Sequence, residues 1–478
     1  MRCTYVLPLV AFLSMSYGAP VESAPGGLPR LKVSENKRFL VTESGEPFFY
    51  AADTAWELFH RLDRKEAVHY LATRARQHFN VVQAVALAEL EGLVDPNANG
   101  DLPLIDKDPT KPWVTPGNRP DNAAAYDYWD HVDFVIDEAN KRGIYVGLLP
   151  TWGAWVSDEK TKIFTPENAR VYGEFLGKRY AHKGVIWVLG GDRVCPGTEP
   201  VWRAMAEGIT KGAAMPAGSD TLLVTFHPRG GGTSSECFHQ DNWLDFNMQQ
   251  TGHQQVERTR GWRKIRRDYN MLPIKPVLDG EPLYEDIAIT ITSNQWGYAF
   301  DAHARQRWYW HVFAGALGQT YGNNSVWQMF APGRKPTIGP ILTWSEALQR
   351  PAANQMQHLR ALIESRPFLS RVPAPEMLED ELEGVDHLEA TRGDGYAFVY
   401  AGTGKKIQLK LGIISGAEIT AWWFNPRTGN ATKIGTFPNQ GSKEFASIAE
   451  GFGADWVLVI DDRSKNFRAP GAPGPLVR

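Results

Sequence analysis

The chain has 478 residues, a formal net charge of −3 and 22% charged residues. This length exceeds that of one ordinary domain, so we expect a large unit and a smaller one. The small negative charge argues against a nucleic-acid partner, because phosphate binding requires a basic surface. The 17 tryptophans either fill a large core or offer aromatic faces on which a sugar ring can stack.

The first 19 residues have the pattern of an export signal. Arg2 supplies a positive charge, residues 5–15 form a short apolar run, and Gly18 and Ala19 are small. The run is too short to span a bilayer. We therefore predict a signal peptide over residues 1–19, a secreted or periplasmic location and no membrane attachment after cleavage. An uncleaved anchor is the alternative.

Export would leave two cysteines in the mature chain, Cys195 and Cys237. An exported protein can oxidise such a pair, but two free thiols are an equally open alternative. No C-x-x-C or H-E-x-x-H spacing occurs, so the sequence indicates no metal site and no cofactor.

Short apolar runs alternate with helical stretches from residue 47 to about residue 320. The helical stretches carry start signals, such as Asp63 followed three residues later by Glu66. Runs that are apolar on both faces are typical of parallel strands covered by helices. The eight runs are residues 48–53, 80–86, 144–150, 185–192, 221–227, 245–249, 276–281 and 315–321.

Eight such units predict an α/β fold, a (β/α)8 TIM barrel over residues 31–365. An open doubly wound sheet is the competing fold, but its G-x-G-x-x-G fingerprint is missing after the first strand. A segment rich in Pro and Asn, residues 90–125, follows the second strand. In a barrel, such a loop lies at the carboxyl-terminal face, where substrates bind.

A second pattern begins after Pro373. Short strands separated by turn residues are predicted at residues 387–390, 396–401, 406–411, 418–424, 432–436 and 456–460. They predict a small all-β sandwich domain over residues 371–462. Residues 463–478 are predicted to form a disordered tail that is rich in Pro and Gly towards its end.

Two carboxylates end predicted barrel strands. The fourth strand ends in Gly-Gly-Asp192 and the seventh in Asp279-Gly-Glu281, where glycine leaves room for a ligand near the backbone. The fourth and seventh strands face each other across a barrel, and barrel chemistry occurs at carboxyl-terminal strand ends. Cleaving a glycosidic bond requires one carboxyl group to protonate the leaving oxygen and a second to attack the sugar or activate water. We therefore interpret Asp192 and Glu281 as a catalytic pair; alternatively, Asp192 pairs with Arg193 and only shapes the loop.

Other predicted strand ends carry polar and aromatic side chains. A few orienting polar groups among aromatic rings are typical of a sugar site. Each residue alone has a structural alternative, since His227 could be a buried, hydrogen-bonded histidine and Trp152 a core residue. The predicted substrate-binding residues are Asp53, Trp56, Gln83, Trp152, Arg193, His227, Gln249, His253, Tyr284, Tyr321 and Trp327.

Several segments together resemble one known family, the apiosidase-like glycoside hydrolases. They are residues 49–56 (FYAADTAW), 80–83 (NVVQ), 187–193 (WVLGGDR), 249–253 (QQTGH) and 278–285 (LDGEPLYE), while residues 425–429 (NPRTG) are similar to the small β domain that ends those proteins. The resemblance implies a (β/α)8 barrel that releases apiose, a branched pentose, from side chains of plant cell-wall pectin. The partner would then be an oligosaccharide or polysaccharide substrate.

The resemblance also implies roles for the two carboxylates: Asp192 as the acid/base and Glu281 as the nucleophile of a retaining mechanism. Two nearby carboxyl groups cannot both ionise easily, so we expect a raised pKa for Asp192 and an ionised Glu281. Similar barrels usually have Asn-Glu at the end of the fourth strand, where this chain has Gly191-Asp192. Glu285 remains a rival nucleophile.

Two other function classes stay open at this point. A non-catalytic carbohydrate-binding or adhesion protein predicts that Arg or Lys neutralises Asp192 and Glu281. A lyase or isomerase predicts a metal-ligand cluster or a strand-end lysine, and Lys275 precedes the seventh strand. The sequence does not determine the sugar, the linkage, exo or endo action, or the oligomeric state.

Overall fold

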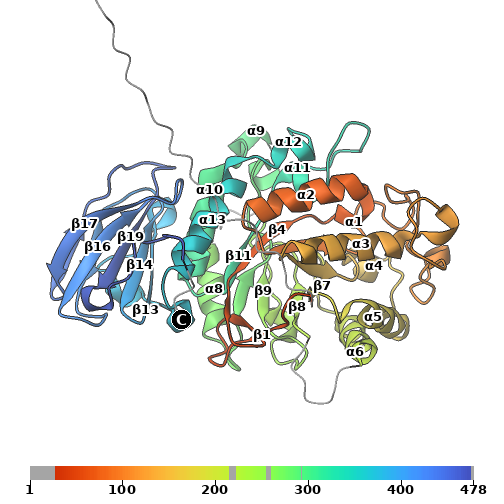
Figure 1. Ribbon diagram of the computed structural model, residues 1–478, viewed down its shortest axis with the longest axis horizontal. Helices are drawn as coiled ribbons and strands as arrows, with labels where there is room; N and C mark the ends of the chain where they lie inside the picture. Colours follow the sequence, from red (N-terminus) through yellow and green to blue (C-terminus); the bar gives the residue numbers. More distant parts are fainter. Residues whose placement is uncertain (1–26, 215–221, 254–259, 292, 475–478) are drawn as a thin grey trace, which may run out of the picture.

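The computed structural model describes residues 27–214, 222–253, 260–291 and 293–474. The predicted signal peptide, residues 1–19, lies outside the described residues. The chain forms an α/β region around central parallel strands and a separate antiparallel β region at one end (Figure 1). Every helix of the described residues is too short or too polar to span a bilayer.

Eight parallel strands lie where the sequence predicts them. They are β4 (Tyr50–Thr54), β5 (Val81–Val85), β6 (Tyr145–Leu149), β7 (Val185–Gly190), β8 (Val224–His227), β9 (Asn247–Gln249), β10 (Val277–Asp279) and β11 (Gly318–Tyr321). Six form one sheet in the order β11-β4-β5-β6-β7-β8, and β9 pairs with β10. All residues of these strands except Val185 are buried, which explains why the runs are apolar on both faces.

The parallel sheet is curled, and its two edge strands approach the β9–β10 pair. Asp245 N donates a hydrogen bond to Val224 O of β8 (2.9 Å), just before β9 begins. Leu317 N donates to Val277 O of β10 (2.8 Å), just before β11 begins. The observed architecture is thus a curled parallel sheet of six strands beside a parallel pair. The prediction was a single closed barrel of eight strands.

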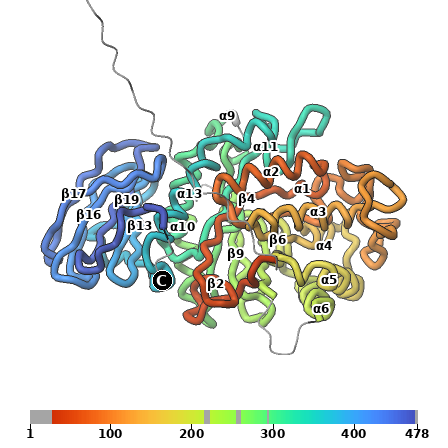
Figure 2. Tube along the Cα trace, in the orientation of Figure 1, coloured from red at the N-terminus to blue at the C-terminus, as the bar shows by residue number. Residues whose placement is uncertain are grey.

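Helices connect the parallel strands and cover them. α2 (Arg64–Arg76) starts with the predicted capping box of Asp63 and Glu66. The other helices are α1 (Leu58–Arg61), α3 (Tyr128–Lys141), α4 (Ala154–Ser157), α5 (Pro166–Tyr180), α6 (Glu199–Ala213), α7 (Ser235–Phe238), α8 (Gly261–Tyr269), α9 (Ser293–Trp296), α10 (Asp301–Phe313), α11 (Asn324–Trp327), α12 (Trp344–Ala347) and α13 (Pro351–Glu364). A small antiparallel sheet, β1 (Leu31–Val33), β2 (Leu40–Thr42) and β3 (Pro47–Phe48), precedes β4. Figure 2 follows the chain from these red strands to the blue antiparallel region.

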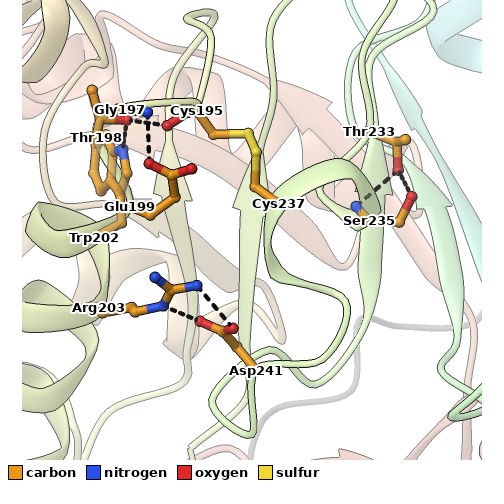
Figure 3. The surroundings of a disulfide bond; sticks show 10 residues. All are labelled: Cys195, Gly197, Thr198, Glu199, Trp202, Arg203, Thr233, Ser235, Cys237 and Asp241. Carbon is orange, nitrogen blue, oxygen red and sulfur yellow. Dashed lines mark hydrogen bonds and ion pairs between the residues drawn. A yellow bond between two sulfur atoms is a disulfide. The ribbon is translucent and has the colours of Figure 1, made fainter.

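A disulfide joins Cys195, in the loop after β7, to Cys237 on α7, with the two Cα atoms 6.4 Å apart. Figure 3 shows its surroundings, including the ion pair between Arg203 Nε and Asp241 Oδ2 (2.7 Å). The bridge therefore ties the loop that carries Asp192 to the segment after β8. This structure has the oxidised pair rather than the alternative of two free thiols.

The antiparallel region contains two sheets. The larger has the order β12-β13-β14-β19-β16-β17, and β15 pairs with β18. The strands are β12 (Val372–Pro373), β13 (Leu388–Gly393), β14 (Tyr396–Ala401), β15 (Ile407–Lys410), β16 (Glu418–Phe424), β17 (Ala431–Pro438), β18 (Ser442–Phe445) and β19 (Trp456–Asp462). All six predicted strands are present, whereas β12 and β18 were not predicted.

The prediction of a disordered tail from residue 463 is wrong for residues 463–474. They begin with a short 3-10 helix, η8 (Arg463–Lys465), in which Lys465 Nζ forms an ion pair with Asp394 (3.1 Å). The Arg366 guanidinium lies 4.8 Å from the centre of the Phe467 ring. These contacts hold the segment against the antiparallel region, and residues 475–478 lie outside the described residues.

Candidate active site

A cavity of about 290 Å³ lies at the carboxyl-terminal ends of the parallel strands. Its wall combines aromatic rings with acidic and amide side chains, the mixture expected of a site for a polar ligand with apolar faces. The lining residues are Trp56, Glu89, Trp152, Asp192, Gly230, Gly231, Gln250, Thr251, Gly252, His253, Glu281, Tyr284, Ile291, Trp327, Thr337 and Ile338.

Glu281 follows β10 and lies between two imidazole rings. His253 Nε2 is 3.0 Å from Oε1 and His227 Nε2 is 3.1 Å from Oε2. The contact with His253 has hydrogen-bond geometry, whereas that with His227 is less well aligned and leaves Oε2 able to meet a ligand. Burial alone would raise the pKa of Glu281, but the two histidines outweigh it and lower this pKa to about 2. Glu281 is therefore ionised at neutral pH.

Asp192 follows β7 in the left-handed conformation, with φ +52°, after Gly190 and Gly191 at φ +89° and +127°. A Cβ atom at Gly191 would come within 2.8 Å of the Trp152 ring, so glycine is required there. The Asp192 carboxylate Oδ1 accepts a hydrogen bond from Gly230 N (3.3 Å). This strained turn therefore directs the Asp192 carboxyl group into the cavity.

The pKa of Asp192 is raised by burial and then by the negative charge of Glu281, which is the expected direction. His227 and Arg193 offset only part of this increase. Arg193 Nη1 is 3.5 Å from Asp192 Oδ2, and Arg193 Nε is 3.3 Å from Asp158 Oδ1. Asp192 thus has an arginine neighbour and also lines the cavity, so it has the contact expected by one interpretation and the position expected by the other.

Glu89 is a cavity residue that the sequence reasoning missed. It is half-buried and lies in the loop after β5. Burial, followed by the charges of Asp192 and Glu57, raises the pKa of Glu89 to about 8. The only available signal was its place directly before the predicted substrate-facing loop of residues 90–125.

Five of the predicted substrate-binding residues line the cavity: Trp56, Trp152, His253, Tyr284 and Trp327. Their rings form two contacts across the wall. The centres of Trp56 and Trp152 are 5.5 Å apart, and those of His253 and Tyr284 are 4.3 Å apart. Among the described residues, Trp152 Nε1 has no hydrogen-bond partner although it is buried.

Four other predicted residues lie beside the cavity without lining it. His227 contacts Glu281, and Arg193 reaches Asp158 at the rim. Gln83 Nε2 donates a hydrogen bond to Gly280 O (2.9 Å), the residue before Glu281. Gln249 is buried, and within the described ranges neither of its amide atoms has a hydrogen-bond partner.

Asp53 and Tyr321 do not line the cavity, contrary to the prediction. The Asp53 carboxylate forms a buried ion pair with Arg74 Nε (2.5 Å) and accepts a hydrogen bond from Tyr70 OH (2.5 Å), both from α2. Tyr321 OH donates to Glu285 (2.8 Å). Both faces of these strands are buried, so the strand-end position did not determine which face carried the ligand site.

Glu285, the rival nucleophile, is held by the protein. Its carboxylate accepts hydrogen bonds from Tyr321 OH (2.8 Å) and Ala352 N (3.3 Å), and burial raises its pKa to about 7. Asp279 accepts a hydrogen bond from Thr251 Oγ1 (2.6 Å) and lies 3.1 Å from His311. Of these three acids in the segment after β9, only Glu281 lines the cavity.

Comparison with known proteins adds independent information. The sequence profile of the apiosidase-like catalytic domain matches residues 34–370, and that of a collagen-binding domain of a collagenase matches residues 372–461. None of the curated proteins matches the chain.

Two solved structures are similar over nearly the whole chain. A protein described as glycoside hydrolase family 5 from Bacteroides vulgatus is 32% identical with a TM-score of 0.83, and the match covers 94% of this chain and 96% of that one. A second, described as a glycoside hydrolase, is 35% identical with a TM-score of 0.82, covering 92% of this chain and 98% of the other. Both matches therefore include the α/β region and the antiparallel region together.

Proposed function

Since the chain belongs to the apiosidase-like family and is a glycoside hydrolase, we propose that it cleaves its substrate by a retaining mechanism with Glu281 as nucleophile and Asp192 as acid/base. One observation carries the proposal: Glu281 is kept ionised by two histidines, while Asp192 in the same cavity has a raised pKa. The reaction requires one carboxyl group of each kind.

In the first step, a Glu281 oxygen attacks the anomeric carbon while the bond to the leaving oxygen breaks. Asp192 gives its proton to that oxygen, so the leaving group departs neutral and a glycosyl-enzyme ester forms. In the second step, the Asp192 carboxylate takes a proton from water. The water oxygen then attacks the same carbon and releases Glu281. A retaining enzyme holds its two carboxyl groups about 5–5.5 Å apart, and we expect that spacing here.

The proposed substrate is an apiose-bearing side chain of plant cell-wall pectin. The family match supports this sugar, and the aromatic wall of Trp56, Trp152 and Trp327 suits the apolar face of a sugar ring. The cavity, at about 290 Å³, is at the small end of ligand pockets, which favours a terminal sugar over the middle of a polymer.

Export and barrel closure belong to the same proposal. The pattern of residues 1–19 supports secretion, as does the Cys195–Cys237 disulfide, because such bonds persist in oxidising compartments. The hydrogen bonds from Asp245 N and Leu317 N support a single closed (β/α)8 barrel.

The alternative of a non-catalytic carbohydrate-binding protein predicts that basic residues neutralise the pair. Asp192 does have Arg193 beside it. Within the described ranges, however, the ion-pair partners of Glu281 are two histidines, and no Arg or Lys pairs with it. The geometry therefore favours catalysis.

The test is hydrolysis of a panel of aryl glycosides and pectin fragments, with the released sugar followed by proton NMR. We expect cleavage of an apioside with retention at the anomeric carbon. First release of the opposite anomer would overturn the retaining mechanism. Binding of sugars without cleavage of any panel member would favour the non-catalytic alternative.

A further inference from the structure

Asp279 is a buried carboxylate beside Glu281 to which the proposed mechanism assigns no role. It ends β10, two residues before Glu281, and its side chain is fully buried. Asp279 Oδ1 accepts hydrogen bonds from Glu281 N (3.2 Å) and Thr251 N (3.3 Å), and Asp279 Oδ2 accepts one from Thr251 Oγ1 (2.6 Å). One carboxylate therefore joins the backbone at Glu281 to the turn that follows β9.

That turn, residues 251–253, brings His253 to the nucleophile. Gly252 N donates a hydrogen bond to Glu281 O (2.9 Å), and His253 Nε2 lies 3.0 Å from Glu281 Oε1. The backbone at His253 is held from its other side as well, because His253 O accepts a hydrogen bond from Thr290 N (2.9 Å). The Glu281 carboxylate and its imidazole partner thus belong to two segments of the chain, and Asp279 bonds to both.

Two helices pack against Asp279. His311 on α10 is fully buried, and its Nδ1 lies 3.1 Å from Asp279 Oδ2 without the alignment of a hydrogen bond. Gly261 begins α8 and leaves room for this ring, since a Cβ atom at Gly261 would lie 2.6 Å from His311 Nε2 and 2.8 Å from Thr251 Cγ2. Asp279 is therefore enclosed by protein and does not line the cavity.

We propose that Asp279 is a positioning residue for the nucleophile, fixing the backbone of Glu281 and of the 251–253 turn so that the Glu281 carboxylate stays against His253. This inference rests on the proposed function, in which Glu281 attacks the anomeric carbon. Attack requires reacting atoms about 3–3.5 Å apart, and a misplacement of about 1 Å costs about 10²-fold in rate. A carboxylate that only satisfied buried donors would instead affect stability and leave each folded molecule equally active.

One hydrogen bond of this network can be removed by itself. Thr251→Val keeps the branched shape of the side chain and removes the hydroxyl that donates to Asp279. Its matched control is Thr233→Val, because Thr233 Oγ1 donates to another buried carboxylate, Asp268, and neither residue lines the cavity. A second pair changes the acid itself. Asp279→Ala removes every bond, whereas Asp279→Asn keeps an acceptor oxygen for Glu281 N and Thr251 N.

The first measurement is the pH profile of kcat/KM on an aryl glycoside whose activated phenol leaves without a proton. The acid limb of this profile reports the ionisation of Glu281. Burial raises the pKa of Glu281 and the two histidines lower it to about 2, so loosening His253 moves the acid limb to higher pH. The other titratable groups near Glu281 are unchanged in every variant: His227 of β8, Asp192 after β7, Glu89 after β5 and Tyr284 after β10.

We expect Thr251→Val to lower kcat/KM about tenfold at the optimum and to move the acid limb up by about one pH unit or more. Asp279→Ala should exceed both effects. Asp279→Asn and Thr233→Val should stay within about threefold of wild type, with the acid limb in place, because both keep the hydrogen bond from Glu281 N.

The second measurement needs no substrate. Crystal structures of the variants give the distance from His253 Nε2 to Glu281 Oε1, which is 3.0 Å in the wild-type chain. It should exceed about 3.5 Å in Thr251→Val, beyond hydrogen-bond reach, and stay unchanged in Thr233→Val and Asp279→Asn.

The outcomes separate this inference from the proposed function. Either an unmoved acid limb or an unchanged distance in Thr251→Val would overturn the positioning role and leave Asp279 with a structural one. Failure of Asp279→Asn to retain activity would assign the effect to the charge of Asp279 rather than to its hydrogen bonds, and would overturn the role too. A Glu281→Gln variant that still cleaved the aryl glycoside would instead overturn the proposed function, whatever the distances show.

Discussion

The acids near the strand ends form two groups. In one group the carboxylates have hydrogen-bond donors from the protein, and in the other they face the cavity. The cavity acids are Glu281, Asp192 and Glu89, and the structural acids are Asp53 and Glu285. The Asp192 side chain is 38% exposed and Glu89 is half-buried, whereas Glu281, Asp53 and Glu285 are buried. Burial thus does not separate Glu281 from the structural acids, and neither does its position after a parallel strand.

The structural acids have protein donors for their carboxylates. Asp53 has Arg74 and Tyr70, and Glu285 has Tyr321 and a backbone N–H. The cavity acids face open space and either share histidines or have few donors. Buried polar groups are normally paired, so a carboxyl group that faces a cavity without a full set of donors indicates a ligand site.

The largest expected effect is that of Glu281→Gln. This change removes the attacking oxygen while preserving the shape of the side chain, so kcat/KM should fall by about 10⁴-fold or more on every substrate. Initial rates on the best aryl glycoside measure the loss, and circular dichroism checks the fold. Glu285→Gln is the matched control among the structural acids, and activity per folded molecule should stay within about threefold. A comparable loss in both variants would remove the distinction between the two groups.

Asp192→Asn should have a smaller effect that depends on the leaving group. Losing the proton donor costs about 10²–10⁴-fold on a poor leaving group, and much less on an activated phenol, which needs no proton. Azide should then restore the rate by attacking the glycosyl-enzyme, and the glycosyl azide formed identifies Asp192 as the acid/base. If azide instead restored the rate of a Glu89 variant and not that of Asp192→Asn, Glu89 would be the acid/base and Asp192 would not.

Asp53→Asn tests the structural acids through stability. It leaves Arg74 buried without its charge partner, and breaking a buried pair costs about 3–5 kcal/mol. Urea unfolding followed by tryptophan fluorescence measures this loss, while kcat per folded molecule should not change. A loss of kcat with unchanged stability would instead support the sequence prediction that Asp53 binds substrate.

Much of the α/β region was predictable because burial on both faces produces apolar runs. All eight parallel strands, including β7 and β10, were found in this way. The same property explains the errors at Asp53 and Tyr321, since a strand buried on both faces shows no alternation that distinguishes the cavity side from the helix side. The approach of the six-stranded sheet to the β9–β10 pair depends on hydrogen bonds between segments distant in sequence, such as Leu317 and Val277, and no local pattern indicates them.

The candidate site was only partly predictable. Asp192 and Glu281 stood out because each ends a strand beside glycine, and the positive φ values at Gly190 and Gly191 explain why glycine is needed. The position of Glu89 depends on the path of a loop, and its proton state on charges brought together by folding. Neither is encoded in a local motif.

The smallest expected effect separates a cavity tryptophan from a structural one. Trp152 and Trp202 are both only 2% exposed, so replacing either by Ala would remove a packed ring and destabilise the protein by about 3–5 kcal/mol. Phe keeps one aromatic ring and removes the indole N–H together with part of the ring, so both variants lose a similar amount of packing and differ in the lost N–H. Trp152 Nε1 has no hydrogen-bond partner among the described residues, whereas Trp202 Nε1 donates to Thr198 Oγ1 (3.1 Å), as Figure 3 shows.

If the Trp152 N–H donates to the substrate, Trp152→Phe should lower kcat/KM by about 2- to 12-fold, the value of one neutral hydrogen bond, and lower Tm less than Trp202→Phe does. Trp202→Phe should lower Tm more and leave kcat/KM unchanged, because its lost bond is internal and Trp202 does not line the cavity. Initial rates and thermal melts of both variants measure the two effects. Equal kinetics in wild type and Trp152→Phe would mean that the Trp152 N–H does not contact the substrate. An unpaired N–H at the cavity wall would then indicate a ligand contact less reliably than a carboxyl group that faces the cavity.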